Sequence, residues 1–171
     1  MSGKHDIVLT WRSLHLADCV VRRALDQRLT GEAECSLLEH DLLAWVTVAP
    51  KQRLQMLELA DLLGVTRGGL TRIVDRLVRR GWIQRDRPES NRRAVHAVLT
   101  PAGQEATVHA RAVYLSTLNQ TLGAHLCDHE LAQLAGITDK LRTALTGATQ
   151  GCVPTGQPPG RFAQGHDPPE S

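Results

Sequence analysis

Aromatic residues are scarce in this chain of 171 residues, which has three tryptophans, one tyrosine and one phenylalanine. Sandwiches and barrels of strands depend on aromatic and β-branched residues, and proteins that read single-stranded nucleic acid stack bases on aromatic rings. The scarcity argues against both classes. Hydrophobic residues still make up 42% of the chain, mainly alanine and leucine, which favour helices and are sufficient for a core.

Long hydrophobic runs, paired cysteines and enzyme motifs are missing as well. No stretch approaches 18 consecutive apolar residues, and residues 1–10 lack the pattern of a secretory signal, so we expect a cytoplasmic protein. Phosphate-binding loops, serine elbows and Cys-x-x-Cys pairs are absent, so we expect no enzyme, no cofactor and no metal. The cysteines show no paired spacing and are expected to be free thiols: Cys19, Cys35, Cys127 and Cys152.

Apolar residues recur every three or four positions along most of the chain, which is the spacing of amphipathic helices. Pro50, Gly64 and Gly81 mark helix ends, and Thr66 and Thr100 are N-cap residues. The predicted elements are helices over 7–29, 37–48, 55–63 and 66–80, strands over 82–85 and 94–99, and helices over 101–122 and 128–146. The chain is therefore predicted to be mainly α with a small β-hairpin.

A change in composition near residue 147 divides the chain. Residues 148–171 hold five of the eight prolines and four of the 14 glycines, with little to bury. We expect one folded domain over 1–146 and a disordered tail over 147–171. Within the domain, residues 36–100 contain three helices followed by a hairpin, the order of a winged helix-turn-helix, which presents one helix to the major groove of DNA.

The helices at 55–63 and 66–80 have the spacing of a helix-turn-helix pair. Ala60 allows close packing, Gly64 permits the tight turn, and Leu70 and Ile73 pack the second helix on the first.

The opposite face of the second helix carries candidate DNA-reading residues. Gly68 and Gly69 each cost a helix about 1 kcal/mol relative to alanine, which favours a role in the close approach of DNA. Arg72 is placed for bidentate hydrogen bonds to guanine, and Thr66 or Thr71 for contacts to a phosphate or a thymine methyl.

Arginine is concentrated around the same segment. Residues 66–93 hold nine arginines and three acidic residues, a local charge of +6 in a chain of net charge +2, so the remainder carries −4. The loop over 87–93 fits a wing that inserts Arg92 or Arg93 into the minor groove, with Asp75 holding a wing arginine such as Arg93. The predicted DNA-binding residues are Thr66, Arg67, Gly68, Gly69, Thr71, Arg72, Asp75, Arg76, Asn91, Arg92 and Arg93.

Three stretches of the sequence closely resemble the MarR family of bacterial regulators: 58–82 (ELADLLGVTRGGLTRIVDRLVRRGW), 91–94 (NRRA) and 99–103 (LTPAG). With the helix order, the resemblance covers about residues 7–146. Two positions depart from the family pattern. Asn91 stands where Asp usually precedes the wing arginines, and Leu57 stands where Ser or Thr commonly begins the third helix.

The resemblance implies a homodimer formed by the helices at 7–29 and 101–146. Each subunit would place residues 66–80 in the major groove of a palindromic site and its wing in the minor groove, associating with the nucleoid when bound. It also implies a repressor that is released by a phenolic, antibiotic or natural-product ligand. We expect that ligand where the first, second and fifth helices meet, although ordinary packing also accounts for each candidate: Trp11, His15, Cys19, His40, Trp45, His109 and Tyr114.

Other interpretations of the same fold remain open. A zinc sensor could use Glu39, His40, Glu105 and His109, whereas the His-x-Cys-x-His run at 125–129 fits poorly on one helix face. An oxidant sensor could use Cys19, if Arg22 or Arg23 lowers its pKa. A winged-helix adaptor that binds no DNA would not need Gly68, Gly69 and Arg72.

Overall fold

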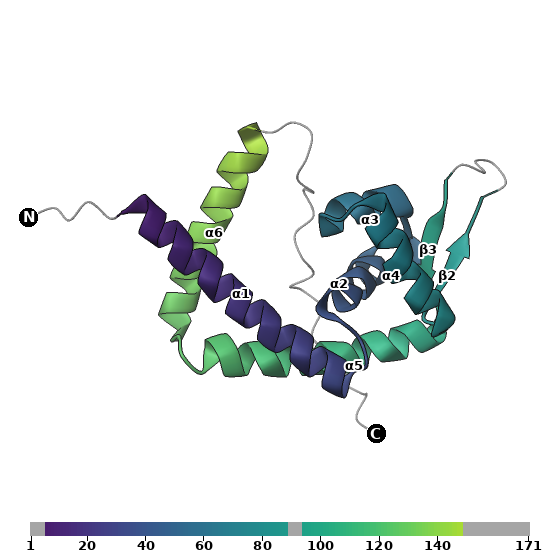
Figure 1. Ribbon diagram of the computed structural model, residues 1–171, viewed down its shortest axis with the longest axis horizontal. Helices are drawn as coiled ribbons and strands as arrows, with labels where there is room; N and C mark the ends of the chain where they lie inside the picture. The colour runs from purple at the N-terminus through teal and green to yellow at the C-terminus, as the bar shows by residue number, and fades with distance from the viewer. Residues whose placement is uncertain (1–5, 89–93, 149–171) are drawn as a thin grey trace, which may run out of the picture.

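The computed structural model describes residues 6–88 and 94–148 (Figure 1). Six helices account for most of these residues, and the order of helices and strands confirms the predicted mainly helical fold with a β-hairpin. The helices are α1 (Ile7–Glu32), α2 (Leu37–Val48), α3 (Met56–Leu63), α4 (Arg67–Arg79), α5 (Pro101–Leu118) and α6 (Asp128–Ala148). The other elements are the turns η1 (Pro50–Gln52) and η3 (Asn119–Gly123) and the strands β1 (Arg53–Gln55), β2 (Ile83–Asp86) and β3 (His96–Leu99).

The three strands form an antiparallel sheet in the order β1-β3-β2. The predicted hairpin is confirmed, with Ile83 opposite Leu99 in the register of β2 and β3. The sequence did not predict β1, which places Arg53 opposite Val98. A strand of three residues is too short to show alternation, and β1 depends on a pairing partner more than 40 residues later in the chain.

Local hydrogen bonds explain where the helices begin and end. The Thr66 hydroxyl accepts from the Gly69 amide at 3.1 Å, and the Thr100 hydroxyl accepts from the Gly103 amide at 3.0 Å, as N-caps do. Gly64 and Gly81 adopt φ of +63° and +74°, which terminates α3 and α4. The helix predicted to reach residue 122 stops at Leu118 and continues as the π-helical turn η3.

The core of the winged helix-turn-helix lobe, which we define as α2–α4 with β1–β3, lies between the helices and the sheet. Helix α4 contributes its predicted apolar face, and α3 contributes Leu59 and Ala60. The α4 residues are at most 4% exposed: Leu70, Ile73, Val74 and Leu77. This packing fixes α4 against α3 and leaves its polar face to solvent.

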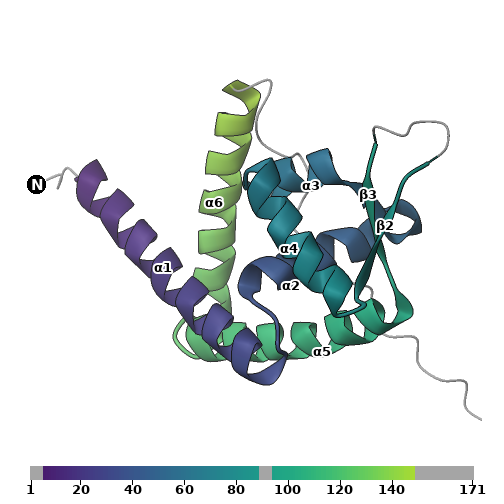
Figure 2. The ribbon, with the colours of Figure 1, turned by 45° about the vertical axis from the view of Figure 1, so that its right-hand side comes forward.

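A second core joins the C-terminal half of α1 to α5 and the start of α2, through residues such as Leu29, Cys35 and Ala110. Trp82 packs against both cores and connects them. Beyond this junction, the N-terminal half of α1 points away from the lobe, and α6 rises from the end of α5 (Figures 1 and 2). Residues 6–20 are all exposed.

Within residues 6–88 and 94–148, no helix combines the length and the hydropathy needed to cross a membrane.

Candidate nucleic-acid interface

The predicted reading face of α4 is exposed and largely free of intramolecular contacts. The side chains of Arg67 and Arg72 lie in solvent and form no ion pair with any residue in the described part of the chain. The Thr66 hydroxyl caps the helix, and the Thr71 hydroxyl donates to the Arg67 carbonyl at 2.9 Å. Two guanidinium groups are therefore free to contact another molecule, on a helix whose opposite side packs in the core.

The two glycines at the start of α4 differ in their surroundings. A Cβ at Gly69 would lie 3.2 Å from the Thr66 Oγ1, so this glycine makes room for the capping hydroxyl. A Cβ at Gly68 would meet nothing within 4 Å and would project into open solvent. The contact with Thr66 thus explains why residue 69 is a glycine. No contact with another described residue explains why residue 68 is a glycine.

Asp75 connects α4 to the hairpin. Its Oδ1 lies 2.7 Å from Arg85 Nη1 on β2, and Arg85 Nη2 donates to the Thr71 carbonyl at 3.5 Å. On the other side of the sheet, Arg53 of β1 pairs with Asp86 at 2.9 Å. These pairs hold the base of the hairpin beside the recognition helix. The predicted partner Arg93, together with Asn91 and Arg92, lies outside the described residues.

Arg76, predicted as a DNA contact, is bound to a carboxylate on the protein side of α4. Its Nε donates to Oε1 of Glu39 at 2.7 Å, and Arg80 Nη1 donates to Glu39 Oε2 at 3.4 Å. The Glu39 side chain is 3% exposed. Glu39 also completes the N-terminal capping box of α2, because Oε2 accepts from the Ser36 amide at 2.9 Å.

Burial by itself would raise the pKa of Glu39, but the Ser36 amide and the two arginines outweigh it and lower the pKa below the ordinary 4.5. The carboxylate is thus ionised at neutral pH and links α2 to the last turns of α4. The same end of α2 is tied to α1, since the Leu37 amide donates to Asp26 at 2.8 Å. Sequence reasoning considered Glu39 only as a zinc ligand and missed this role.

The structure distributes the seven predicted ligand-pocket residues over separate places. Trp11, His15 and Cys19 line one exposed side of α1, where Cys19 Sγ lies 3.7 Å from His15 Nε2. His40 stacks on Tyr114 between α2 and α5, with ring centroids 4.4 Å apart.

The remaining two are apart from both groups. His109 Nε2 lies 2.8 Å from the Glu32 carbonyl oxygen, and Trp45 lines a cavity between α2 and α3.

The described residues give little support to a zinc sensor or an oxidant sensor. Among residues 6–88 and 94–148, no group of three His, Cys, Asp or Glu side chains is arranged to hold a metal ion, and Glu39 is engaged by arginines. Cys19 is a free, exposed thiol, and its neighbour Arg22 is paired with Asp18 at 3.3 Å. Cys35 is buried, and burial followed by the charge of Glu39 raises its pKa to about 11.

Comparison with known proteins gives one consistent result. A sequence model described as the MarR family matches residues 36–95. The transcriptional repressor MprA of Escherichia coli K12 is 31% identical over 142 residues, which cover 82% of this chain and 78% of MprA.

Solved structures agree with the sequence comparison. Sco3205, a MarR family regulator from Streptomyces coelicolor in complex with DNA, is 27% identical with a TM-score of 0.74, covering 84% of this chain and 88% of Sco3205. A variant of MarR from E. coli complexed with operator DNA is also 27% identical, with a TM-score of 0.69, covering 79% of this chain and 94% of that chain.

Proposed function

The chain belongs to the MarR family of transcriptional regulators, which are not enzymes, and from this premise we propose that it is a homodimeric, ligand-responsive repressor of a palindromic DNA site. Each subunit places α4 in the major groove and the tip of its hairpin in the minor groove. The proposed base and phosphate contacts on α4 are Thr66, Arg67, Gly68, Gly69, Thr71 and Arg72.

The observation that carries this proposal is the reading face of α4. Arg67 and Arg72 are exposed on it without an intramolecular ion pair in the described chain, and Gly68 leaves open space beside them. Free guanidinium groups on a rigid helix fit the bidentate recognition of guanine. Asp75 and Arg76 are bound to Arg85 and Glu39, so we assign them the positioning of the hairpin and of α4. We keep Asn91, Arg92 and Arg93 as wing contacts on their sequence pattern alone.

The exposed apolar sides of α1 and α6 support the homodimer. On α6, Ile137 is 59% exposed and Leu145 is 64% exposed, and on α1 Trp11 is 64% exposed. Isolated apolar stripes of this extent on two helices require a partner to bury them. A two-fold dimer built on these helices would present two α4 helices about 10 bp apart on one face of DNA.

We place the effector where α1, α2 and α5 meet, beside the stacked rings of His40 and Tyr114. An aromatic ligand at this junction would contact α2 beside Glu39. Because Glu39 binds Arg76 and Arg80, the ligand would act through α2 on the position of α4.

Selection of bound fragments from the source genome, followed by fluorescence anisotropy on the enriched duplex, tests the proposal. Arg72→Ala should cost about 1–3 kcal/mol at one base pair and relax the preference there. Arg23→Ala removes a guanidinium from an exposed residue of α1 and should leave the preference unchanged. No enriched site, or an equal loss for Arg72→Ala on all sequences, would contradict base reading by α4.

A further inference from the structure

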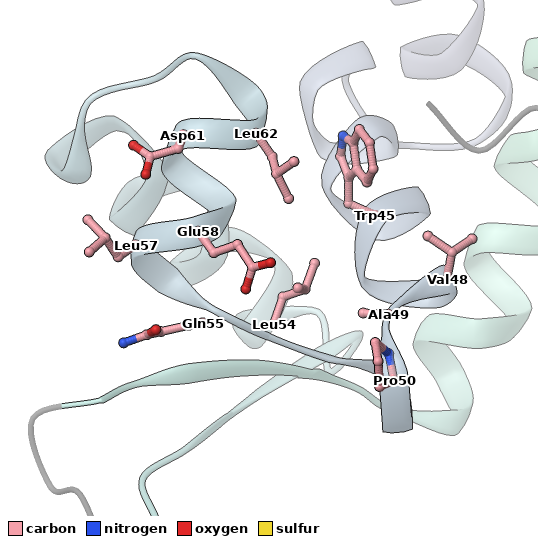
Figure 3. A pocket seen from close by; sticks show the side chains of 10 residues that line it. All are labelled: Trp45, Val48, Ala49, Pro50, Leu54, Gln55, Leu57, Glu58, Asp61 and Leu62. Carbon is pink, nitrogen blue, oxygen red and sulfur yellow. The ribbon is translucent and has the colours of Figure 1, made fainter. Parts of the chain in front are cut away.

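A cavity of about 600 Å³ lies between α2 and α3 (Figure 3), and none of the residues that line it is among the proposed DNA or dimer contacts. Its walls come from the C-terminal half of α2, from residues 48–50, from β1 and from α3. The volume falls within the roughly 300–1,000 Å³ of small-molecule sites.

The walls are apolar except for two carboxylates and one amide. Trp45 of α2, Leu54 of β1 and Leu62 of α3 form apolar surface on three sides. Figure 3 shows the Glu58 carboxylate extending from α3 into the space above Leu54. Asp61 and Gln55 also line the cavity, at its outer edge, where Figure 3 shows both side chains directed away from Trp45. The residues that line the cavity include no lysine, arginine or histidine.

The two carboxylates differ from other acidic residues of the lobe, because neither forms an ion pair within the described residues. Glu39, Asp75 and Asp86 each hold an arginine at 2.9 Å or less. Glu58 stands in the first turn of α3, where the helix dipole favours a negative charge. Asp61 stands near the C-terminal end of the same helix, where the dipole opposes it, and no cation compensates.

We propose that this cavity binds a small lipophilic organic cation. The apolar body of the ligand packs against Trp45, Leu54 and Leu62, and its positive charge lies beside Glu58, with the charge of Asp61 acting from the outer edge of the cavity. An indole face also attracts a cation through its quadrupole. The same carboxylates repel an anion of equal size, so the site selects by charge as well as by shape.

The position of the cavity connects it to α4. On one side of α3, Leu59 and Ala60 pack in the core against α4. The other side of α3 faces the cavity. A ligand between α2 and α3 therefore contacts the helix on which α4 rests. Any effect of the bound cation on DNA affinity depends on the proposed function, whereas the binding of the cation itself does not.

Isothermal titration of the full-length chain without DNA tests the site with two probes of nearly equal size and opposite charge. Tetraphenylphosphonium should bind once per chain, and tetraphenylborate at least tenfold more weakly. Glu58→Gln with Asp61→Asn keeps both shapes and removes both charges, and should weaken tetraphenylphosphonium about tenfold, as expected for two exposed charge interactions. The matched control is Glu105→Gln, an exposed carboxylate on α5 outside the cavity lining, which should leave affinity unchanged.

Three results would overturn the proposal: no binding of tetraphenylphosphonium, tetraphenylborate binding at least as tightly, or cation binding that the double variant leaves intact. The last outcome would assign the cation to another apolar surface, such as the exposed stripes of α1 and α6. Because the titration contains no DNA, failure of the proposed DNA reading would not change its result.

Discussion

The winged helix-turn-helix lobe and the two arms, residues 6–20 of α1 and helix α6, use apolar residues in opposite ways. In the lobe, leucines such as Leu59 and Leu77 are 0% exposed. In the arms, Leu141 is 49% exposed and Leu16 is 64% exposed. The contacts within the lobe bury its hydrophobic residues, whereas the arms leave theirs exposed, where the proposed dimer would bury them.

This contrast assigns different physical roles to the two regions. Substitutions in the lobe core should change the free energy of unfolding of each subunit, and substitutions on the arm stripes should change the association of subunits. Helix α6 illustrates the second case, because all its described side chains except Leu131 are exposed along 128–145. A charge placed there disturbs little inside the subunit.

The largest effect should therefore come from the arms. Ile137→Asp with Leu141→Asp places two charges on the stripe of α6 and should convert the proposed dimer to monomers in sedimentation equilibrium. Loss of the second half-site should lower operator affinity by about 10²–10⁴-fold, as for any bivalent ligand reduced to one site. The circular dichroism of the lobe should persist. If the double variant remained dimeric, the exposed apolar residues of α6 would not form the contact between subunits.

The next largest effect should come from the lobe core. Leu77→Ala deletes a fully buried side chain of α4 and should lower the free energy of unfolding by about 2–5 kcal/mol in a urea titration. Val78→Ala, one residue further and 37% exposed, is the matched control and should cost under about 0.5 kcal/mol. Equal losses for the two variants would mean that the lobe core is not organised around this face of α4.

Features encoded by local sequence were predictable. The period of α4 identified Leu70, Ile73, Val74 and Leu77 as its buried face, and Thr66 and Gly81 marked its ends. Each of these depends on residues within one or two helical turns, so a single sequence contains the information.

Features made by contacts between distant segments were not predictable. Glu39 and Arg76 are 37 positions apart, and β1 exists only through pairing with β3. The run Ser36-x-x-Glu39 does carry the pattern of a capping box, a signal that could have placed Glu39 at a helix start. Its second function as the partner of two arginines needed the packing of α4 on α2. For the same reason the sequence could not show which of the seven pocket candidates lie together: His40 stacks on Tyr114 only because α2 crosses α5.

Glu39→Gln should give an intermediate effect, located inside the lobe where α2 is linked to α4. The variant keeps the shape and loses the charge that binds Arg76 and Arg80, and should cost about 1–3 kcal/mol of unfolding free energy at pH 7. Since the pKa of Glu39 is lower in the folded chain than its ordinary 4.5, this contribution is present above pH 4.5 and is lost as the pH falls through the folded pKa. Urea titrations from pH 7 down to pH 3 should bring the two proteins together. A pH-independent difference would assign the cost to packing.

Asp75→Asn should give the smallest effect, and it separates a surface ion pair from the buried one. The side chains of Asp75 and Arg85 are 47% and 33% exposed, so water and salt screen their attraction. We expect a loss of about 0.2–1 kcal/mol at low ionic strength that disappears in 1 M sodium chloride. The Glu39→Gln difference should largely persist there, because the Glu39 carboxylate is 3% exposed. If Asp75→Asn proved as costly as Glu39→Gln at both salt concentrations, the hairpin would be held to α4 as firmly as α2 is, and solvent would not screen the pair of Asp75 and Arg85.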